Sequence, residues 1–110
     1  MILRIWHGWT NHENADAYQQ TLIDEVFPGI AAKNVRGYRG IELLRRDSGQ
    51  EVEFVTIMRF DSLDAVREFA GEDYRVSYVP AKPRTLLSRF DAHAAHYELC
   101  HQGQPAPRTP

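Results

Sequence analysis

His7 lies inside the first apolar segment of the chain, Ile2–Thr10, and its side chain can exchange protons. An imidazole has a reference pKa of about 6.5, so it accepts and returns a proton near neutral pH. On a covered strand such a group is typical of a general base. A hydrogen-bonded histidine of the core is the alternative interpretation, and both stay open.

Two further histidines, His93 and His96, lie three residues apart near the end of the chain. In an extended strand this odd spacing places the two imidazoles on opposite faces, so they cannot chelate one metal ion. The sequence also has no glycine-rich phosphate loop, no Gly-x-Ser-x-Gly, no Cys-x-x-Cys and no acidic metal loop. We therefore expect no metal site and no cofactor.

Arg59 interrupts an otherwise apolar strand, and Arg4 does the same in the first strand. A guanidinium in such a place needs water, a carboxylate or an anionic ligand. One interpretation is an ion pair with Glu42, Glu53 or Glu98. The other is a bidentate contact that orients a substrate.

Several aromatic residues could form the walls of a cavity for a flat aromatic ligand, with a tyrosine hydroxyl as a polar group. These residues are Trp6, Trp9, Phe69, Tyr74 and Tyr78. An aromatic core without a ligand is the alternative, because aromatic stripes more often pack inside a domain.

The elements that must position these side chains follow the order β-α-β-β-α-β. Alternation and β-branched residues predict four strands, and three- and four-residue spacing of apolar residues predicts two helices. The expected strands cover 2–10, 37–46, 51–61 and 93–100, and the expected helices cover 10–27 and 61–70. Pro28-Gly29 is expected to interrupt the first helix, and 74–79 is expected to form a further helical turn.

This order predicts a ferredoxin-like α+β fold with an antiparallel sheet and helices on one face. In the first strand Leu3, Ile5, His7 and Trp9 share one face, yet the other face is also apolar. One layer of helices cannot cover both faces. We therefore expect a homodimer in which the second face packs against its copy.

Length and charge exclude several classes of protein. A chain of 110 residues forms one domain, and 13 Lys+Arg against 15 Asp+Glu give a net charge of −2, without the basic excess of a nucleic-acid binder. No apolar run reaches the ~18 residues of a membrane helix, so we expect no membrane contact. A single cysteine, Cys100, fits the reducing cytoplasm. Three prolines within 102–110 predict a disordered tail after a domain of residues 1–101.

Motifs spread along the chain resemble the antibiotic-biosynthesis-monooxygenase-like (ABM) family. They are Trp6-His-Gly-Trp-Thr10, Ala17-Tyr18, Gly37-Tyr-Arg-Gly-Ile41, Leu44-Arg-Arg46, Phe60-Asp-Ser-Leu-Asp-Ala-Val66, Phe69-Ala-Gly-Glu-Asp-Tyr74 and His96-Tyr-Glu98. The resemblance extends to about Cys100. It implies a dimeric α/β barrel built from two ferredoxin-like subunits, with a cavity between sheet and helices.

The resemblance also implies a cofactor-independent monooxygenase that oxidises a small aromatic or polyketide-like substrate with O2. His7 is then the expected base, while Arg59 or Tyr74 holds the enolate or phenolate. The side chains expected to bind the substrate are Trp9, Phe69, Tyr78 and His96.

Two other functions are possible on the same fold. One is a non-catalytic ligand-binding or structural dimer. The other is haem degradation, which in this family relies on an Asn in the first strand, a Trp on the second helix and a later haem-ligating His. This chain has His7 and Phe69 at the first two positions and no histidine in 75–81, so haem degradation is the less expected of the three.

Overall fold

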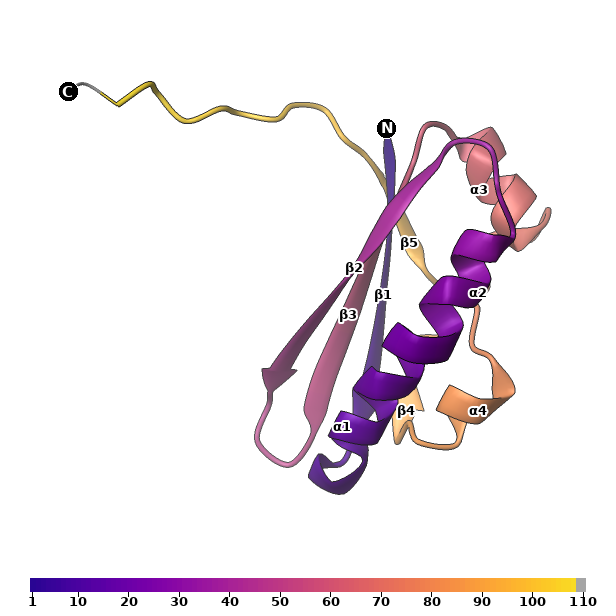
Figure 1. The fold of residues 1–110 in the computed structure, drawn as a ribbon, viewed down its shortest axis with the longest axis vertical. Coiled ribbons are helices and arrows are strands. Elements are labelled where there is room, and N and C mark those ends of the chain that lie inside the picture. The colour runs from indigo at the N-terminus through magenta and orange to yellow at the C-terminus, as the bar shows by residue number, and fades with distance from the viewer. Residues whose placement is uncertain (109–110) are drawn as a thin grey trace.

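An antiparallel sheet organises the chain, and the computed structural model describes it over residues 1–108. Its strands are β1 (Ile2–Thr10), β2 (Tyr38–Asp47), β3 (Val52–Phe60), β4 (Arg89–Phe90) and β5 (Ala95–Glu98). They lie in the order β2-β3-β1, with β4 and β5 both paired along the other edge of β1 (Figure 1). The last strand, β5, thus pairs antiparallel with the first, β1. The fourth strand of the predicted plan is divided into these two short pieces.

The helices cover one face of this sheet. One long helix is made of three continuous parts, α1 (His12–Thr21), the π-helical turn η1 (Leu22–Val26) and α2 (Phe27–Ala32). Asn11 caps it, since its side chain accepts a hydrogen bond of 2.8 Å from the backbone N–H of Asn14. Two shorter helices follow, α3 (Leu63–Ala70) and α4 (Ala81–Arg84). The predicted ferredoxin-like α+β fold is therefore confirmed.

The expected interruption of the first helix at Pro28-Gly29 is wrong, because the helix continues to Ala32. The π turn explains how proline is accommodated. In η1 the N–H of Phe27 bonds to the carbonyl of Leu22, five residues earlier, which shifts the hydrogen-bond register just before the proline. Pro28, which has no N–H to donate, lies directly after this shift in register.

Local signals placed α3 and the hairpin correctly. The hydroxyl of Ser62 accepts from the N–H of Ala65, and Gly71 ends α3 with a φ of 89°. In β2 the register shifts between Tyr38 and Gly40, and Gly40 adopts a φ of 122° at this bulge. These glycines and caps fix where each element starts and stops.

The two faces of the sheet differ in what covers them. On the helix-covered face Arg4, Trp6, Gly8 and Thr10 of β1 are buried. The core beneath the helices has two clusters, one around Phe60, Val66 and Phe69 and one around Tyr18, Leu22 and Phe54. The alternating residues of β1 point to the opposite face, which no helix covers and where they are only half-buried. In this single chain the sheet is open and does not close into a barrel.

The expected helical turn at 74–79 is also wrong. Val76 instead forms an isolated β-bridge with His93, and Ser77 N–H donates to the carbonyl of Ala92. These bonds hold the segment extended against the chain that precedes β5. The helical turn of this region, α4, begins only after Pro80, whose fixed φ suits a helix start.

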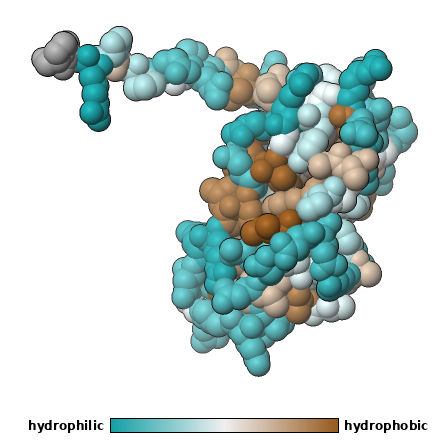
Figure 2. Space-filling view, viewed as in Figure 1, coloured by the Kyte–Doolittle hydropathy of each residue, from teal (hydrophilic) through white to brown (hydrophobic). Residues whose placement is uncertain are grey.

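Residues 101–108 have no secondary structure and extend away from the sheet (Figure 1). The last two residues of the predicted tail, 109–110, lie outside the described residues. Within residues 1–108, no helix has the length and apolar character needed to cross a membrane. Figure 2 shows apolar surface gathered in the middle of the molecule in this view, bordered by polar side chains.

Candidate functional site

Arg4 is a buried cation in the sheet, on the face that the helices cover. Only 3% of its surface is exposed. Its Nη1 donates to the carbonyl oxygen of Tyr74 and lies 3.0 Å from Nε2 of His96. Its Nη2 donates to the carbonyl oxygen of Val76 at 3.1 Å. The guanidinium is therefore held in one orientation by neutral acceptors on two separate segments.

In the part of the chain that the structure describes, the charge of Arg4 has no carboxylate partner. Within residues 1–108, every ion pair involves other residues. Burial lowers the pKa of Arg4 to about 10, because the charged form loses its hydration. The guanidinium still carries its proton at neutral pH. A buried, uncompensated positive charge favours the binding of an anion beside it.

His96 lies directly opposite Arg4 in the register between β5 and β1. Burial, together with the charges of Arg4 and Arg75, lowers the pKa of His96 to about 4. The imidazole is therefore neutral at physiological pH. Because Arg4 can only donate, Nε2 of His96 accepts, which leaves the ring proton on Nδ1. The Tyr74 ring packs edge-on against this imidazole, with ring centres 5.1 Å apart.

Aromatic rings complete the surroundings of Arg4. Its Cζ lies 5.7 Å from the centre of the Phe69 ring, within the range of a cation–π contact. Tyr78 packs edge-on against Phe69 at 5.3 Å. The Lys33 ammonium lies 4.4 Å from the Tyr78 ring centre and 4.8 Å from that of Phe69. The Phe69 ring therefore contacts both the guanidinium of Arg4 and the ammonium of Lys33, and the Tyr78 ring contacts the ammonium.

A small cavity adjoins Arg4 between the sheet and the long helix. Its volume is about 40 Å³, which is room for a few water molecules. The residues that line it are Arg4, Trp6, Val26, Phe27, Ile30, Ile41, Thr56, Met58 and Tyr78. Arg4 is the only charged residue among them. A drug-sized ligand needs roughly 300 Å³ or more, so a ligand of that size requires the walls to move.

Of the seven residues predicted for the site, four gather around Arg4 and three do not. Phe69, Tyr74, Tyr78 and His96 lie together on the helix-covered side. Tyr74 contributes its backbone carbonyl and its ring, and its hydroxyl is not among the contacts of Arg4.

His7, Trp9 and Arg59 lie on the open face of the sheet, so in this single chain the sheet separates them from the other four residues. Nδ1 of His7 lies 3.3 Å from a carboxylate oxygen of Asp91, and its ring stacks on Trp9. Arg59 forms an ion pair with Glu42, which is the structural alternative predicted for it. The strict alternation of β1 separates His7 from Arg4 and Trp6, because neighbouring residues point to opposite faces.

Two residues of the site were not assigned to it from sequence. The sequence marks Arg4 only as a charge in an apolar strand and Trp6 only as a possible cavity wall, with no role in binding or catalysis for either. Their shared face was the available signal, since Arg4 and Trp6 are two residues apart in one strand. In the structure the Trp6 ring is fixed by a hydrogen bond of 2.8 Å from Nε1 to the carbonyl of Asp91.

Comparison with known proteins gives matches in structure but not in sequence. No family model matches the sequence, and no curated protein does. A Bacillus cereus protein assigned to the antibiotic biosynthesis monooxygenases is 12% identical, with a TM-score of 0.68 over 97% of this chain and 98% of that chain. SnoaB, a cofactor-independent oxygenase from Streptomyces nogalater, is 18% identical, with a TM-score of 0.55 over 96% and 98%.

The haem-degrading protein MhuD of Mycobacterium tuberculosis also matches. In a structure with two haems bound in its active site it is 16% identical, with a TM-score of 0.60 over 94% of this chain and 100% of that chain. The cavity beside Arg4 does not fit such a group. No histidine lines it, and the nearest imidazole, His96, directs its Nε2 to Arg4.

These matches extend over nearly the full length of both chains. At such low identities they show the fold rather than the reaction. The chain has the ferredoxin-like α+β fold of the antibiotic biosynthesis monooxygenase-like proteins.

Proposed function

We propose that this protein binds a small, flat, acidic molecule beside Arg4 and oxidises it with O2, without a cofactor. The observation that supports the proposal is the buried guanidinium of Arg4, which lines a cavity and has no carboxylate partner within the described chain. An enolate or a phenolate supplies the missing negative charge. The aromatic and aliphatic lining suits the flat, apolar remainder of such a molecule.

In this mechanism Arg4 stabilises the deprotonated substrate, so its proton passes to water as the substrate binds. The electron-rich carbanion form of the substrate then reduces O2 directly. When a methylene carbon reacts, one oxygen atom of O2 becomes the new carbonyl oxygen, and the other leaves as water with both methylene hydrogens. The substrate carbon supplies all four electrons. Neutral His96 and the carbonyls of Tyr74 and Val76 keep the guanidinium aimed at the substrate oxygen.

His7 and Arg59 have no part in this mechanism, because they lie on the other face of the sheet. Oxygen uptake with a polycyclic hydroxyanthrone tests this assignment. We expect uptake by the unaltered protein, a large loss in Arg4→Met, and no loss in Arg39→Met, which removes an exposed arginine paired with Asp61. Loss of uptake in His7→Ala with full activity in Arg4→Met would place the chemistry on the open face and refute the proposal.

A second candidate is ligand binding without catalysis. The small volume of the cavity, about 40 Å³, favours it, because a polycyclic substrate needs more room. A spectral shift of the bound hydroxyanthrone to its anion, without oxygen uptake above the uncatalysed rate, would identify the protein as a binder. Both candidates require Arg4.

We also propose that two copies associate through the open sheet face, as a dimeric barrel. This face carries apolar side chains that no helix covers, and Leu44 and Tyr97 on or beside it are 47% and 56% exposed. A sheet face of this kind is normally buried in a partner. The single free cysteine, Cys100, supports a reducing compartment and hence the cytoplasm.

A further inference from the structure

A second, larger pocket lies directly outside the cavity beside Arg4. Its volume is about 210 Å³, and it is open to the surface between the long helix and the segment that leads into α4. Its lining residues are Thr21, Glu25, Val26, Gly29, Tyr78, Pro80, Lys82 and Pro83. Val26 and Tyr78 line both spaces. Only these two side chains are common to the inner cavity and the outer pocket, which makes them the wall between them.

Tyr78 is the weaker part of this wall. Its side chain is 42% exposed, and within residues 1–108 its own backbone makes no hydrogen bond. Its neighbours are anchored, since Ser77 bonds to Ala92 and the carbonyl of Pro80 accepts from Arg84. The ring packs against Phe69 and lies under the Lys33 ammonium. Val26, in contrast, belongs to the hydrogen-bonded π turn of the long helix.

Gly29 explains why the outer pocket is open. Glycine is the poorest helix former after proline, yet Gly29 lies inside α2 with ordinary helical backbone. A Cβ atom built on it meets no other atom within 4 Å, so neither crowding nor backbone strain requires a glycine there. Any larger side chain at this position would project into the outer pocket. The glycine therefore costs helix stability and leaves the pocket free.

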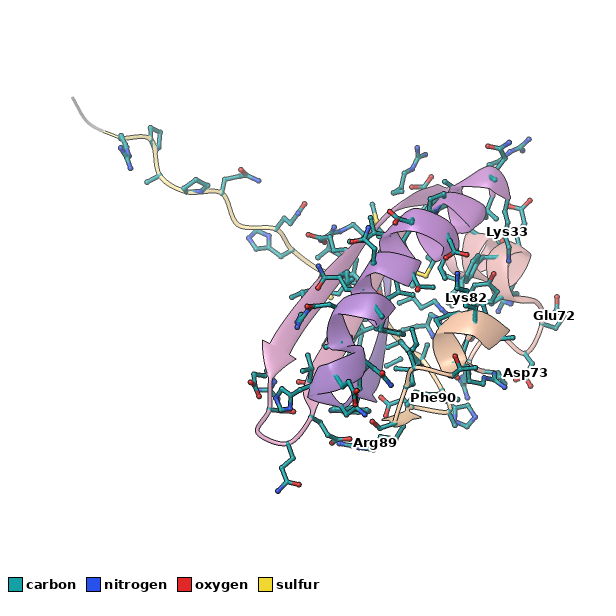
Figure 3. The ribbon with its side chains drawn as sticks, turned by 60° about the horizontal axis from the view of Figure 1, so that its bottom comes forward. Lys33, Glu72, Asp73, Lys82, Arg89 and Phe90 are labelled. Carbon is teal, nitrogen blue, oxygen red and sulfur yellow. The ribbon has the colours of Figure 1, made fainter. Side chains whose placement is uncertain are left out.

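The far side of the pocket is closed by an ion pair. The Lys82 ammonium on α4 lies 2.5 Å from a carboxylate oxygen of Glu25 in η1, and both residues line the pocket. Figure 3 shows α4 with Lys82 lying alongside the long helix, while Lys33 lies toward the end of that helix. This pair ties α4 to the long helix at the edge of the outer pocket.

We propose that the outer pocket is the access route to the cavity beside Arg4, with Tyr78 as its movable gate and Gly29 as the residue that keeps the route open. Rotation of the Tyr78 ring away from Phe69 would join the two spaces into one. The identity of the molecule that passes, a flat acidic substrate, rests on the proposed function. The route itself does not, because it is inferred only from the two spaces and the side chains that line both of them.

The test is collisional quenching of Trp6 by acrylamide in a Trp9→Phe background, which leaves Trp6 as the only tryptophan. Trp6 is 8% exposed and lines the inner cavity, so its quenching reports access to that cavity. We expect Tyr78→Ala to raise the bimolecular quenching constant about threefold and Gly29→Leu to lower it by about half. Tyr78→Phe and Gly29→Ala are the matched controls, and neither should change the constant appreciably.

Equal quenching constants in Gly29→Leu and Gly29→Ala, together with no increase in Tyr78→Ala, would overturn the proposal. If Gly29→Leu does not fold, the Tyr78 pair of variants decides alone. For the binding of a hydroxyanthrone, Gly29→Leu should slow association and dissociation by the same factor and leave Kd unchanged. Failure of the proposed function would appear as absent oxygen uptake in the unaltered protein, while the quenching result would stand.

Discussion

Replacing Arg4 by methionine separates the free-energy cost of burying its charge from the contribution of that charge to ligand binding. Burial lowers the pKa of Arg4 from its ordinary value to about 10, and each pKa unit corresponds to about 1.4 kcal/mol. The charged form is therefore destabilised in the folded protein by about 3 kcal/mol. Methionine has a similar length and removes this cost. It also leaves the carbonyls of Tyr74 and Val76 and Nε2 of His96 without their donor.

The two effects oppose each other. A hydrogen bond from a charged donor contributes about 1.5–3 kcal/mol, and an orphaned buried acceptor costs about 1–3 kcal/mol. We therefore expect the free energy of unfolding of Arg4→Met to stay within about 2 kcal/mol of the unaltered protein. Urea unfolding followed by circular dichroism measures it. The small net change distinguishes Arg4 from a core residue, whose truncation typically costs more.

Binding should respond much more strongly. Loss of one charge-assisted hydrogen bond to an anionic oxygen reduces affinity by roughly 10- to 150-fold. The assay is titration with a hydroxyanthrone and with its O-methyl ether, which cannot ionise at that oxygen. Arg4→Met should weaken binding of the first far more than of the second, and Arg39→Met should change neither. An unchanged ratio of the two dissociation constants, or unfolding of Arg4→Met, would refute the assignment of Arg4 as an anion-binding residue.

Three further predictions follow from other contacts. His96 stays neutral in the folded protein down to about pH 4, whereas in the unfolded chain it takes up a proton near pH 6.5. The free energy of unfolding should therefore decrease by about 1–2 kcal/mol as the pH is lowered from 6.5 to 4, after allowance for partial exposure. In His96→Asn this decrease should be absent from urea titrations at successive pH values. A Cβ on Gly8 would lie 2.8 Å from the Trp6 ring, so Gly8→Ala should destabilise the protein by about 1–3 kcal/mol and shift Trp6 emission, and an unchanged spectrum would contradict the packing. Ile57→Asp places a charge at the centre of the open sheet face and should convert a dimer to a monomer in light scattering, unless association uses another surface.

Much of the fold could be predicted from sequence because its signals are local. The caps at Ser62 and Gly71, the hairpin turn and the alternation of β1 and β3 each act within a few residues. The continuation of the long helix through Pro28 could not, since it depends on a π turn that no propensity encodes. The extended segment around Val76 depends on its bridge to His93, a contact between distant residues.

The site was predicted only in part for a related reason. Alternation showed that Arg4 and His7 lie on different faces of β1, but not which face the helices cover. Both faces of β1 carry large apolar residues, so hydrophobicity alone did not decide between them. Phe69, Tyr74 and Tyr78 lie near one another because they follow one another at and after the end of α3. Their charged centre, Arg4, comes from seventy residues earlier in the chain.

The strict alternation of β1 has a consequence for how this protein can vary. Arg4 and Trp6 line the cavity under the helices, while Ile5 and His7, one step away in the chain, belong to the open face. Substitutions at successive positions therefore act on separate surfaces, and their effects on ligand and on assembly should combine independently. An insertion or deletion of a single residue within β1 would move the side chains that follow it to the opposite face of the sheet. As long as the length of β1 is kept, variation on one face of this strand therefore leaves the residues of the other face in place.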